Sequence, residues 1–485
     1  MEKVIRTRFA PSPTGYMHIG NLRTALYAYL LAKKNRGSFI LRIEDTDCER
    51  KVEGAVDLIY KTLRQAGLCW DEGPDIGGNY GPYIQSQRMA IFKQHALELV
   101  EKGFAYYCFC NKDRLTKIRT LQKAAKQVPK YDGHCRNLTS LQVEQNLKAG
   151  KAFVIRQKMP LVGQTKFTDL VFGEVVFDNS NLDDQILIKS DGMPTYNFAN
   201  VVDDHLMKIT HVIRGSEYLS STPKYNLLYD AFGWERPCYV HCSPVMKNAT
   251  TKFSKRNGDA TFEDLLNQGF LPEAVVNYVA LLGWSPKCEQ EIFSLKQLEK
   301  VFDVGGIVKS PAIFDFNKLL AVNAVYLKKL SDDEFLNLAK PYIKEVVKSE
   351  IDLNFLVKML KTRISVFGEI KNQLDFIDFL PEFDLNLFIH KKMKTNLELS
   401  LQVLEEVLIV FKKMDSFKFN DVHSAVFELI EKLGLKNGQV LWPIRTAVSG
   451  KQFTPGGGVD LVCLLGKFKT VERIQMAIDR LKQVV

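Results

Sequence analysis

The feature that most constrains the fold is an abrupt change of hydrophobic period near the N-terminus. Val4 to Phe9 is a short β-branched and aromatic run, as expected of a buried strand. From Leu22 to Leu30, apolar residues recur at spacings of three and four, which places them on one face of a helix. Ser38 to Ile43 then returns to strand composition. The chain is therefore predicted to open with a strand, a loop, a helix and a second strand.

The loop of this unit predicts a phosphate-binding site. Residues 8–21 read Arg-Phe-Ala-Pro-Ser-Pro-Thr-Gly-Tyr-Met-His-Ile-Gly-Asn, with Asn21 as the expected helix cap and Gly37 as the expected helix end. In a βαβ unit this loop lies at the carboxyl edge of the sheet, where the free N–H groups of the helix attract anions. His18 can donate to a phosphate oxygen, and Gly20 leaves room for a base. A histidine here can equally be a cap or a surface residue.

Other nucleotide-binding patterns do not match. The sequence contains no Gly-x-x-x-x-Gly-Lys-Ser/Thr, and Gly15 and Gly20 do not form Gly-x-Gly-x-x-Gly. A second basic element stands far along the chain, where residues 252–256 read Lys-Phe-Ser-Lys-Arg in a polar stretch with glycine. We expect this element to be an exposed, mobile loop. A solvated basic loop without function is the alternative.

Together, these two stretches resemble the His-x-Gly-His and Lys-Met-Ser-Lys-Ser elements of class I aminoacyl-tRNA synthetases. Four further stretches are similar to the bacterial glutamyl enzymes of this class, namely Arg-Phe-Ala-Pro-Ser-Pro-Thr-Gly at 8–15, Arg-Ile-Glu-Asp-Thr-Asp at 42–47, Asn-Val-Val-Asp-Asp-His at 200–205 and Val-Ile-Arg-Gly at 212–215. The likeness runs from the first strand to the last helix. Asn21 replaces the second histidine, and Phe253 and Arg256 vary the lysine element. Both departures resemble variants of the glutamyl branch.

The resemblance implies a ligase that forms glutamyl-adenylate from L-glutamate and ATP, with Mg²⁺, and transfers the glutamyl group to the 3′-terminal ribose of tRNA. The catalytic residues implied are His18, Lys252 and Lys255. Those implied to bind ATP are His18, Gly20, Asn21, Lys252, Ser254 and Lys255. Those implied to bind glutamate are Arg8, Ala10, Ser12, Glu44, Tyr196, Asn200 and Arg214. Among these, Glu44 takes the ammonium, while the two arginines contact the carboxylates.

Two of these residues have ordinary structural alternatives. Glu44, Asp45 and Asp47 crowd the end of the second strand, and a solvated strand end would also explain them. Arg214 at a strand end suits a bidentate carboxylate contact, yet a buried salt bridge is the usual role of such an arginine. A cationic pocket would let the enzyme prefer glutamate to neutral glutamine, since its arginines would otherwise be buried without a counter-charge.

The cysteines predict one metal site. Cys108-x-Cys110 followed by Tyr131-x-x-x-Cys135 has the spacing of a structural zinc site, in which two close thiolates and a later pair complete a tetrahedron. Tyr131 is the expected fourth ligand and His134 the reserve. Three unliganded thiols are the alternative. The resemblance supports zinc, since many bacterial members carry it here. Cys238, His241 and Cys242 also cluster, but on an apparent strand, where core packing is expected.

The length of 485 residues and the changes of pattern predict several structural units. We expect an α/β fold with a split Rossmann-type catalytic domain, an inserted acceptor-binding domain and an all-α C-terminal anticodon-binding region. The expected boundaries are 1–90 and 191–245 for the catalytic domain, 91–190 for the insertion, 246–317 for a stem-contact region and 318–485 for the helical region. The strands within 171–189 are expected to complete the insertion, and 51–67 to be a helix.

The net charge of +10 fits a partner that carries many phosphates. We expect tRNA(Glu) to be that partner, with tRNA(Gln) left open, and the protein to be a monomer. The N-terminus has no signal core, and no apolar run is long enough for a membrane helix, so a cytoplasmic protein is expected. Two relatives with other roles are alternatives: a paralogue that glutamylates queuosine in tRNA, which lacks the anticodon domain, and a non-catalytic RNA-binding protein.

Overall fold

The structure, a computed structural model, describes residues 4–47, 52–253 and 260–485. It divides the chain into two compact units. The N-terminal unit holds residues 1–265 and 275–316, and the C-terminal unit holds residues 266–274 and 317–485. The short segment 266–274 therefore belongs to the C-terminal unit, although the rest of that unit begins only at residue 317. Within the described ranges, no helix combines the length and the apolar character needed to cross a bilayer.

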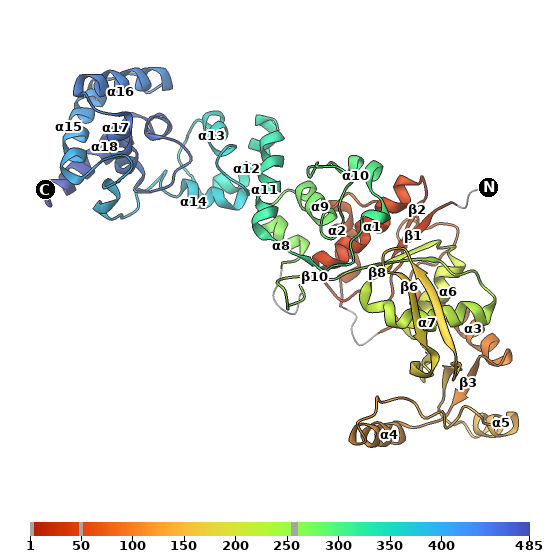
Figure 1. The fold of residues 1–485 in the computed structure, drawn as a ribbon. Coiled ribbons are helices and arrows are strands. Elements are labelled where there is room, and N and C mark those ends of the chain that lie inside the picture. The colour runs from red at the N-terminus through yellow and green to blue at the C-terminus, as the bar shows by residue number, and fades with distance from the viewer. Residues whose placement is uncertain (1–3, 48–51, 254–259) are drawn as a thin grey trace. The chain divides into compact units, whose positions relative to one another are not determined.

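The N-terminal unit opens as expected, with β1 (Arg6–Phe9), α1 (Ile19–Lys34) and β2 (Ser38–Leu41), and the two strands pair in parallel (Figure 1). Two details of the prediction are wrong. His18, not Asn21, caps α1, because its Nδ1 accepts the N–H of Asn21 at 3.3 Å. The helix ends at Lys34, before Gly37. Position 37 requires glycine for a different reason. A Cβ atom there would overlap the backbone carbonyl of Ile5.

A four-stranded sheet in the order β6-β5-β9-β8 continues the unit, formed by β5 (Gln164–Asp169), β6 (Gly173–Asp178), β8 (His211–Gly215) and β9 (Cys238–Cys242). The strands β8 and β9 are parallel, and the β5–β6 hairpin joins them where Asp169 pairs with Tyr239. Arg6 N donates to Thr210 Oγ1 at 2.8 Å, which ties β1 to the start of β8. The expectation that the strands within 171–189 all complete the insertion is therefore wrong for β6. The alternation of apolar and polar residues predicts a strand, but it does not predict which other strand it pairs with.

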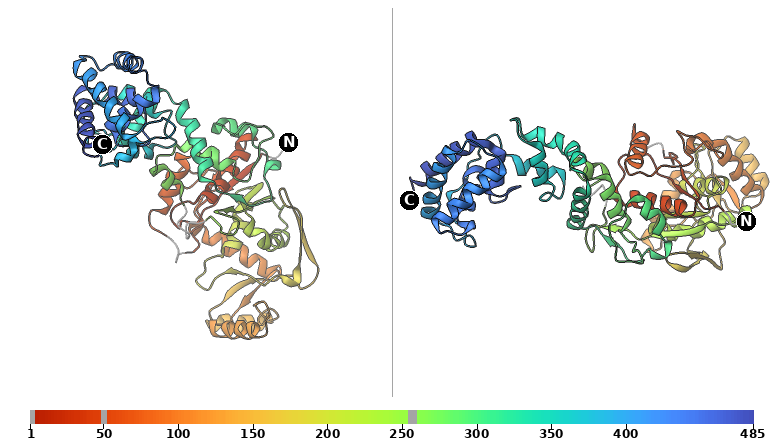
Figure 2. Two further views of the ribbon diagram at one scale, coloured as in Figure 1. Left: turned by 60° about the vertical axis from the view of Figure 1, so that its left-hand side comes forward. Right: turned by 90° about the horizontal axis from the view of Figure 1, so that it is seen from above.

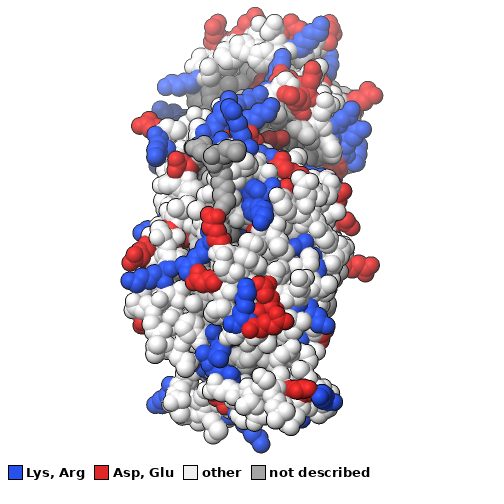
Figure 3. Space-filling model, turned by 90° about the vertical axis from the view of Figure 1, so that its right-hand side faces the viewer, with Lys and Arg blue, Asp and Glu red and all other residues white. Residues whose placement is uncertain are grey.

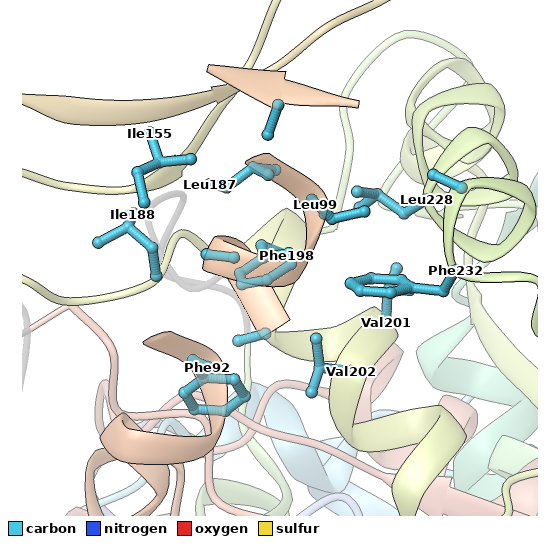
Figure 4. Packing of buried hydrophobic residues seen from close by; sticks show 14 of the residues in the cluster. Phe92, Leu99, Ile155, Leu187, Ile188, Phe198, Val201, Val202, Leu228 and Phe232 are labelled. Carbon is cyan, nitrogen blue, oxygen red and sulfur yellow. The ribbon is translucent and has the colours of Figure 1, made fainter. Parts of the chain in front are cut away.

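A second, antiparallel sheet consists of β3 (Ala105–Cys108), β4 (Val154–Gln157) and β7 (Ile186–Ile188). Two solvent-exposed helices without buried residues, α4 (Lys112–Ala124) and α5 (Ser140–Lys148), lie near β3 in Figure 1. A core joins this sheet to α3 (Met89–Glu101), α6 (Tyr196–Leu206) and α7 (Thr222–Phe232). Figure 4 shows Phe92, Phe198 and Phe232 among the aliphatic side chains of this core.

Apart from 3₁₀ turns, the remaining elements before the helical region are short. They are α2 (Ala55–Gln65), α8 (Phe262–Asn267), α9 (Pro272–Ala280), α10 (Leu295–Val301) and the parallel pair β10 (Val245–Met246) and β11 (Ala312–Ile313). The helix expected over 51–67 begins only at Ala55, after Gly54 in the left-handed region with φ of 73°. Thr261 Oγ1 accepts from Asp264 N at 3.2 Å and donates to the Asp264 carboxylate, which forms a capping box at the start of α8.

The C-terminal unit is helical, as expected. After α11 (Phe316–Lys329), its helices are α12 (Asp332–Val346), α13 (Leu353–Leu360), α14 (Ile370–Leu374), α15 (Leu397–Lys413), α16 (Phe419–Leu433), α17 (Asn437–Ser449) and α18 (Gly458–Leu481). In both views of Figure 2, the last four pack against one another. Gly466, with φ of 72°, interrupts α18. Within this unit, Phe367 N donates to Gly269 O at 3.3 Å, which ties the segment 266–274 to the later helices.

Candidate active site

A cavity of about 240 Å³ lies beside the N-terminus of α1 and the carboxyl ends of β1, β8 and β9. Its lining includes most of the predicted site, namely Arg8, Ala10, Ser12, His18, Gly20, Asn21, Tyr196, Arg214 and Lys252. Glu44 and Asn200 are buried and do not line it. Ser254 and Lys255 lie outside the described residues. The structure thus brings the N-terminal loop, the β8 arginine and the start of the lysine element to one cavity.

His18 is oriented by the helix that it caps. Because Nδ1 accepts the N–H of Asn21, the proton of a neutral ring resides on Nε2. A Cβ at Gly20 would lie 3.0 Å from His18 Cε1 and 3.1 Å from Nδ1, so glycine gives the ring the space it occupies. His18 also forms an antiparallel bridge with Thr261, just after the lysine element. This bridge holds the chain at Thr261 beside His18.

The described part of the lysine element is anchored at its first two residues. Lys252 bridges to Met246, and its Nζ lies 4.0 Å from the Glu217 carboxylate, with both side chains about half exposed. Phe253 is buried, and its ring centroid lies 4.6 Å from that of Phe314. The expectation of an exposed loop is therefore wrong for Phe253, because its aromatic ring packs in the core.

Arg8 is held by a buried network of charges. Its Nε donates to Asp204 Oδ1 at 3.1 Å, and Nη1 donates to the Ile213 carbonyl at 3.3 Å. Arg42 reaches the same Asp204 carboxylate at 2.8 Å. Burial disfavours ionisation of Asp204, but the two guanidinium groups outweigh it and hold its pKa below the usual range. In the sequence, the only indication of a role for Asp204 was its place in the stretch 200–205, which resembles the glutamyl enzymes.

Glu44 lies at the end of the strand region after β2 and pairs with Arg42, whose Nη2 lies 3.0 Å from Oε1. Oε2 is buried and has no hydrogen-bond partner among the described residues. Burial raises the pKa of Glu44 to about 7, although Arg42 and Arg8 oppose the shift. The alternative of a solvated strand end is wrong for Glu44. The Oε2 atom of Glu44 is therefore available to contact a bound cation.

Arg214 has a different environment from Arg8. Its Nε donates to His241 Nε2 at 3.1 Å and its Nη2 to Thr222 Oγ1 at 2.8 Å. The guanidinium carbon lies 4.6 Å from the centroid of the Tyr225 ring. Among the described residues, no carboxylate forms an ion pair with Arg214, so the alternative of a buried salt bridge is not what the structure shows. The arginine is nevertheless only 5% exposed.

Sequence reasoning missed the partners of this arginine. His241, on β9, was expected only to pack in the core, and Asp169 was not singled out. Both side chains are buried, and they lie 2.7 Å apart at His241 Nδ1 and Asp169 Oδ2. The one signal available was the polar residue within the apolar strand Cys-Tyr-Val-His-Cys at 238–242.

The predicted thiols lie together, away from the cavity. The Sγ atoms of Cys108, Cys110 and Cys135 are all within 4.8 Å of one another, and those of Cys110 and Cys135 are 3.6 Å apart. Tyr131 Oη lies 3.3 Å from Cys108 Sγ and 3.4 Å from Cys110 Sγ. His134 is exposed and is not part of this thiol group. Tyr131 therefore lies beside the thiols, and its role as a metal ligand stays a prediction.

Two family models match the chain. Residues 4–321 match "tRNA synthetases class I (E and Q), catalytic domain", and residues 334–478 match "Anticodon binding domain". A glutamate–tRNA ligase of Clostridium botulinum strain Eklund 17B is 58% identical over 99% of each chain, and one of Clostridium tetani is 56% identical over 99% of each chain.

The fold comparison agrees. A crystal structure of a glutamate–tRNA ligase from Elizabethkingia meningosepticum, in complex with its amino acid, has a TM-score of 0.90 and 36% identity, with 99% of this chain and 100% of that chain covered. A glutamate–tRNA synthetase structure from Elizabethkingia anophelis has a TM-score of 0.89 and 35% identity, with 98% and 100% covered. The chain therefore belongs to the glutamate–tRNA ligase family of class I aminoacyl-tRNA synthetases.

Proposed function

We propose that the protein ligates L-glutamate to tRNA in two steps, by forming glutamyl-adenylate from ATP and then transferring the glutamyl group to the 3′-terminal ribose of tRNA. The observation that carries the proposal is that one cavity is lined both by His18 and Lys252, which can bind phosphate, and by two buried arginines, Arg8 and Arg214. A site of this composition suits a substrate with carboxylates beside a triphosphate.

Arg214 accounts for the choice of a substrate with a side-chain carboxylate. Its described partners are neutral, so a bound carboxylate would supply its counter-charge, whereas Arg8 already shares Asp204. Glutamine would leave this buried charge unpaired, which costs far more than the loss of one surface contact. Tyr196, Ala10 and Ser12 would complete the wall around the amino acid.

Glu44 would receive the ammonium of the substrate. Its buried Oε2 has no partner among the described residues, and a carboxylate with a raised pKa gains a charge partner when a cation arrives. Asn200 also has a buried side-chain nitrogen, Nδ2, without a described partner. Because unsatisfied buried polar groups are costly, both residues suit a role beside a polar ligand.

Activation requires no protein nucleophile. The α-carboxylate of glutamate attacks the α-phosphorus of ATP, and pyrophosphate leaves. His18, with its Nε2 proton, would donate to the phosphates as charge builds, while Lys252 and Lys255 would neutralise the departing pyrophosphate. Gly20, Asn21 and Ser254 would complete the ATP site, and Mg²⁺ would accompany ATP.

The thiol group fits a structural zinc ion. A tetrahedral Zn²⁺ with Zn–S bonds near 2.3 Å separates its sulfurs by roughly 3.8 Å, and Cys110 and Cys135 are 3.6 Å apart. Cys108 completes the set of three thiols, and Tyr131 Oη lies within 3.4 Å of the sulfurs of Cys108 and Cys110. We propose that these four residues hold zinc, which would brace the segment between β3 and α5.

The anticodon-domain match over 334–478 supports tRNA charging rather than modification of queuosine by a relative that lacks this domain.

The test of the proposed function is ATP–pyrophosphate exchange with purified protein, glutamate and tRNA(Glu). Exchange that depends on both glutamate and tRNA is expected, and its absence would overturn the proposal. Charging tRNA(Glu) and tRNA(Gln) side by side decides whether the second is also a substrate, and sedimentation velocity tests the expected monomer.

Lys255 gives a sharper test of the mechanism. Replacing it with alanine removes one of the charges proposed for pyrophosphate, so Lys255→Ala should slow exchange by about 10²-fold. The Kd for glutamate, measured by calorimetry, should stay nearly constant because the lysine acts on the phosphates. An unchanged exchange rate would refute this role.

A further inference from the structure

Arg214 is the end of a buried chain of three side chains from three different strands. Asp169 ends β5, His241 lies on β9, and Arg214 lies on β8. Asp169 Oδ2 lies 2.7 Å from His241 Nδ1, and Arg214 Nε donates to His241 Nε2 at 3.1 Å. All three residues are at most 5% exposed. The proposed carboxylate-binding arginine is therefore linked to a residue that does not line the cavity.

The hydrogen bonds determine which ring nitrogen of His241 carries the proton. A carboxylate only accepts, so Nδ1–H donates to Asp169, and this leaves the Nε2 lone pair to accept from Arg214 Nε–H. Asp169 is fixed in turn, because its Oδ1 accepts from the backbone N–H groups of Val171 and Phe172 at 2.9 and 2.8 Å. Only a neutral ring in this one tautomer can hold Arg214.

The remaining contacts also leave one nitrogen for a ligand. Arg214 Nη2 is bound by Thr222, and no described residue accepts a hydrogen bond from Nη1. Tyrosine rings of Tyr218, Tyr225 and Tyr239 surround the guanidinium at 4.6 to 5.4 Å. With Nε and Nη2 fixed, the planar group has one orientation, and its residue lines the cavity. Orientation of this kind lowers the entropy lost when a carboxylate binds.

We propose that Asp169 and His241 are positioning residues, which hold Arg214 through a fixed histidine tautomer and so set the affinity of the site for the side-chain carboxylate of glutamate. The inference rests on the proposed function, in which Arg214 binds that carboxylate. Asp169 and His241 contribute to recognition without touching the substrate. Burial lowers the pKa of His241 although Asp169 opposes the shift, which agrees with a neutral ring.

A matched pair of variants separates the roles of the two ring nitrogens of His241. His241→Asn keeps a donor near the Nδ1 position for Asp169 but loses the acceptor for Arg214, whereas His241→Gln can place an acceptor near the Nε2 position. We expect His241→Asn to raise the KM for glutamate in ATP–pyrophosphate exchange by about tenfold or more, the value of one lost charge-assisted hydrogen bond. The KM for ATP should change by less than about twofold, and His241→Gln should recover much of the glutamate affinity.

Asp169→Asn provides a second route to the same result. An amide NH₂ at the Oδ2 position would favour the other tautomer, whose Nε2–H points at Arg214 Nε–H, so the KM for glutamate should again rise while the KM for ATP does not. If His241→Asn does not fold, as judged by thermal unfolding, Asp169→Asn and His241→Gln carry the same comparison. His211→Asn, at the other end of β8, is the control and should leave both KM values unchanged.

Equal rises of the glutamate and ATP KM values would reduce Asp169 and His241 to structural residues, and an unchanged glutamate KM in folded His241→Asn would overturn the proposal outright. Failure of the proposed function gives a different result, because the wild-type protein would then show no glutamate-dependent exchange at all.

Discussion

At the scale of single residues, the two arginines of the cavity differ in what balances their charge. Both are nearly buried, at 4% and 5% exposure for Arg8 and Arg214. Arg8 is paired with Asp204, while the described partners of Arg214 are neutral. The first arrangement stabilises the empty protein, and the second leaves a charge for the substrate to balance.

Glu44 should make glutamate binding depend on pH. Its pKa of about 7 means that the carboxyl is protonated below neutral pH in the free protein, and a neutral acid cannot pair with an ammonium. Binding must then release a proton, so the Kd for glutamate should rise by about tenfold per pH unit below 7. Calorimetry from pH 8 to pH 5.5 measures this. Glu44→Gln should bind weakly at every pH, and the same slope in this variant would exclude Glu44 as its source.

Gly20→Ala tests the space around His18. The new methyl group would lie 3.0 Å from the ring, which must shift by a few tenths of an ångström. A displaced donor weakens phosphate stabilisation, so the exchange rate should fall by about tenfold. The midpoint of thermal unfolding should not fall, because alanine is the better helix former. A loss of stability together with activity would indicate a packing effect instead.

At the scale of elements, the segment from β3 to α5 depends on few apolar contacts. The helices α4 and α5 have no buried residues, and the core beside them consists of Tyr106, Cys108 and Cys135 with partly buried neighbours. A bound metal would supply the order that this small core lacks.

Removing one thiol tests this dependence. Cys135→Ser should abolish zinc binding, measured by atomic absorption, and should increase hydrogen exchange in 109–139, because the crosslink between the strand and the later turn is lost. Cys288→Ser, at an exposed cysteine, is the matched control. Equal zinc content in the two variants would show that the three thiols are unliganded.

The elements also show what the sequence can predict. The strand, loop and helix around His18, the capping box at Thr261 and the thiol group all depend on residues close in sequence or on a recognised motif. The link from Asp169 to His241 spans 72 residues and exists because β5 pairs with β9. Hydrophobic alternation identifies both strands but does not determine their order in the sheet, so this part of the site was out of reach. The predicted roles of the site residues and the bounds of the five predicted segments stay predictions.

At the scale of the whole molecule, the net charge of +10 suits a partner with many phosphates, such as tRNA. On the face in Figure 3, lysines and arginines alternate with acidic residues. Because the net charge is positive, charge should contribute to binding a polyanion, and salt should weaken that contribution. The KM for tRNA should rise by about tenfold or more between 50 and 200 mM KCl, while the KM for glutamate changes little. Filter binding gives the slope, and a salt-independent tRNA affinity would contradict a charge-driven contact.

The division of the chain also has a consequence for its synthesis. Residues 266–274 leave the ribosome before most of the unit in which they pack, since Leu271 N donates to an Asn323 side chain 52 residues further on. Phe270 and Leu271 are buried in the finished protein. Until the later helices emerge, Leu271 lacks its Asn323 partner, so this apolar stretch can complete its packing only after that part of the chain has been synthesised.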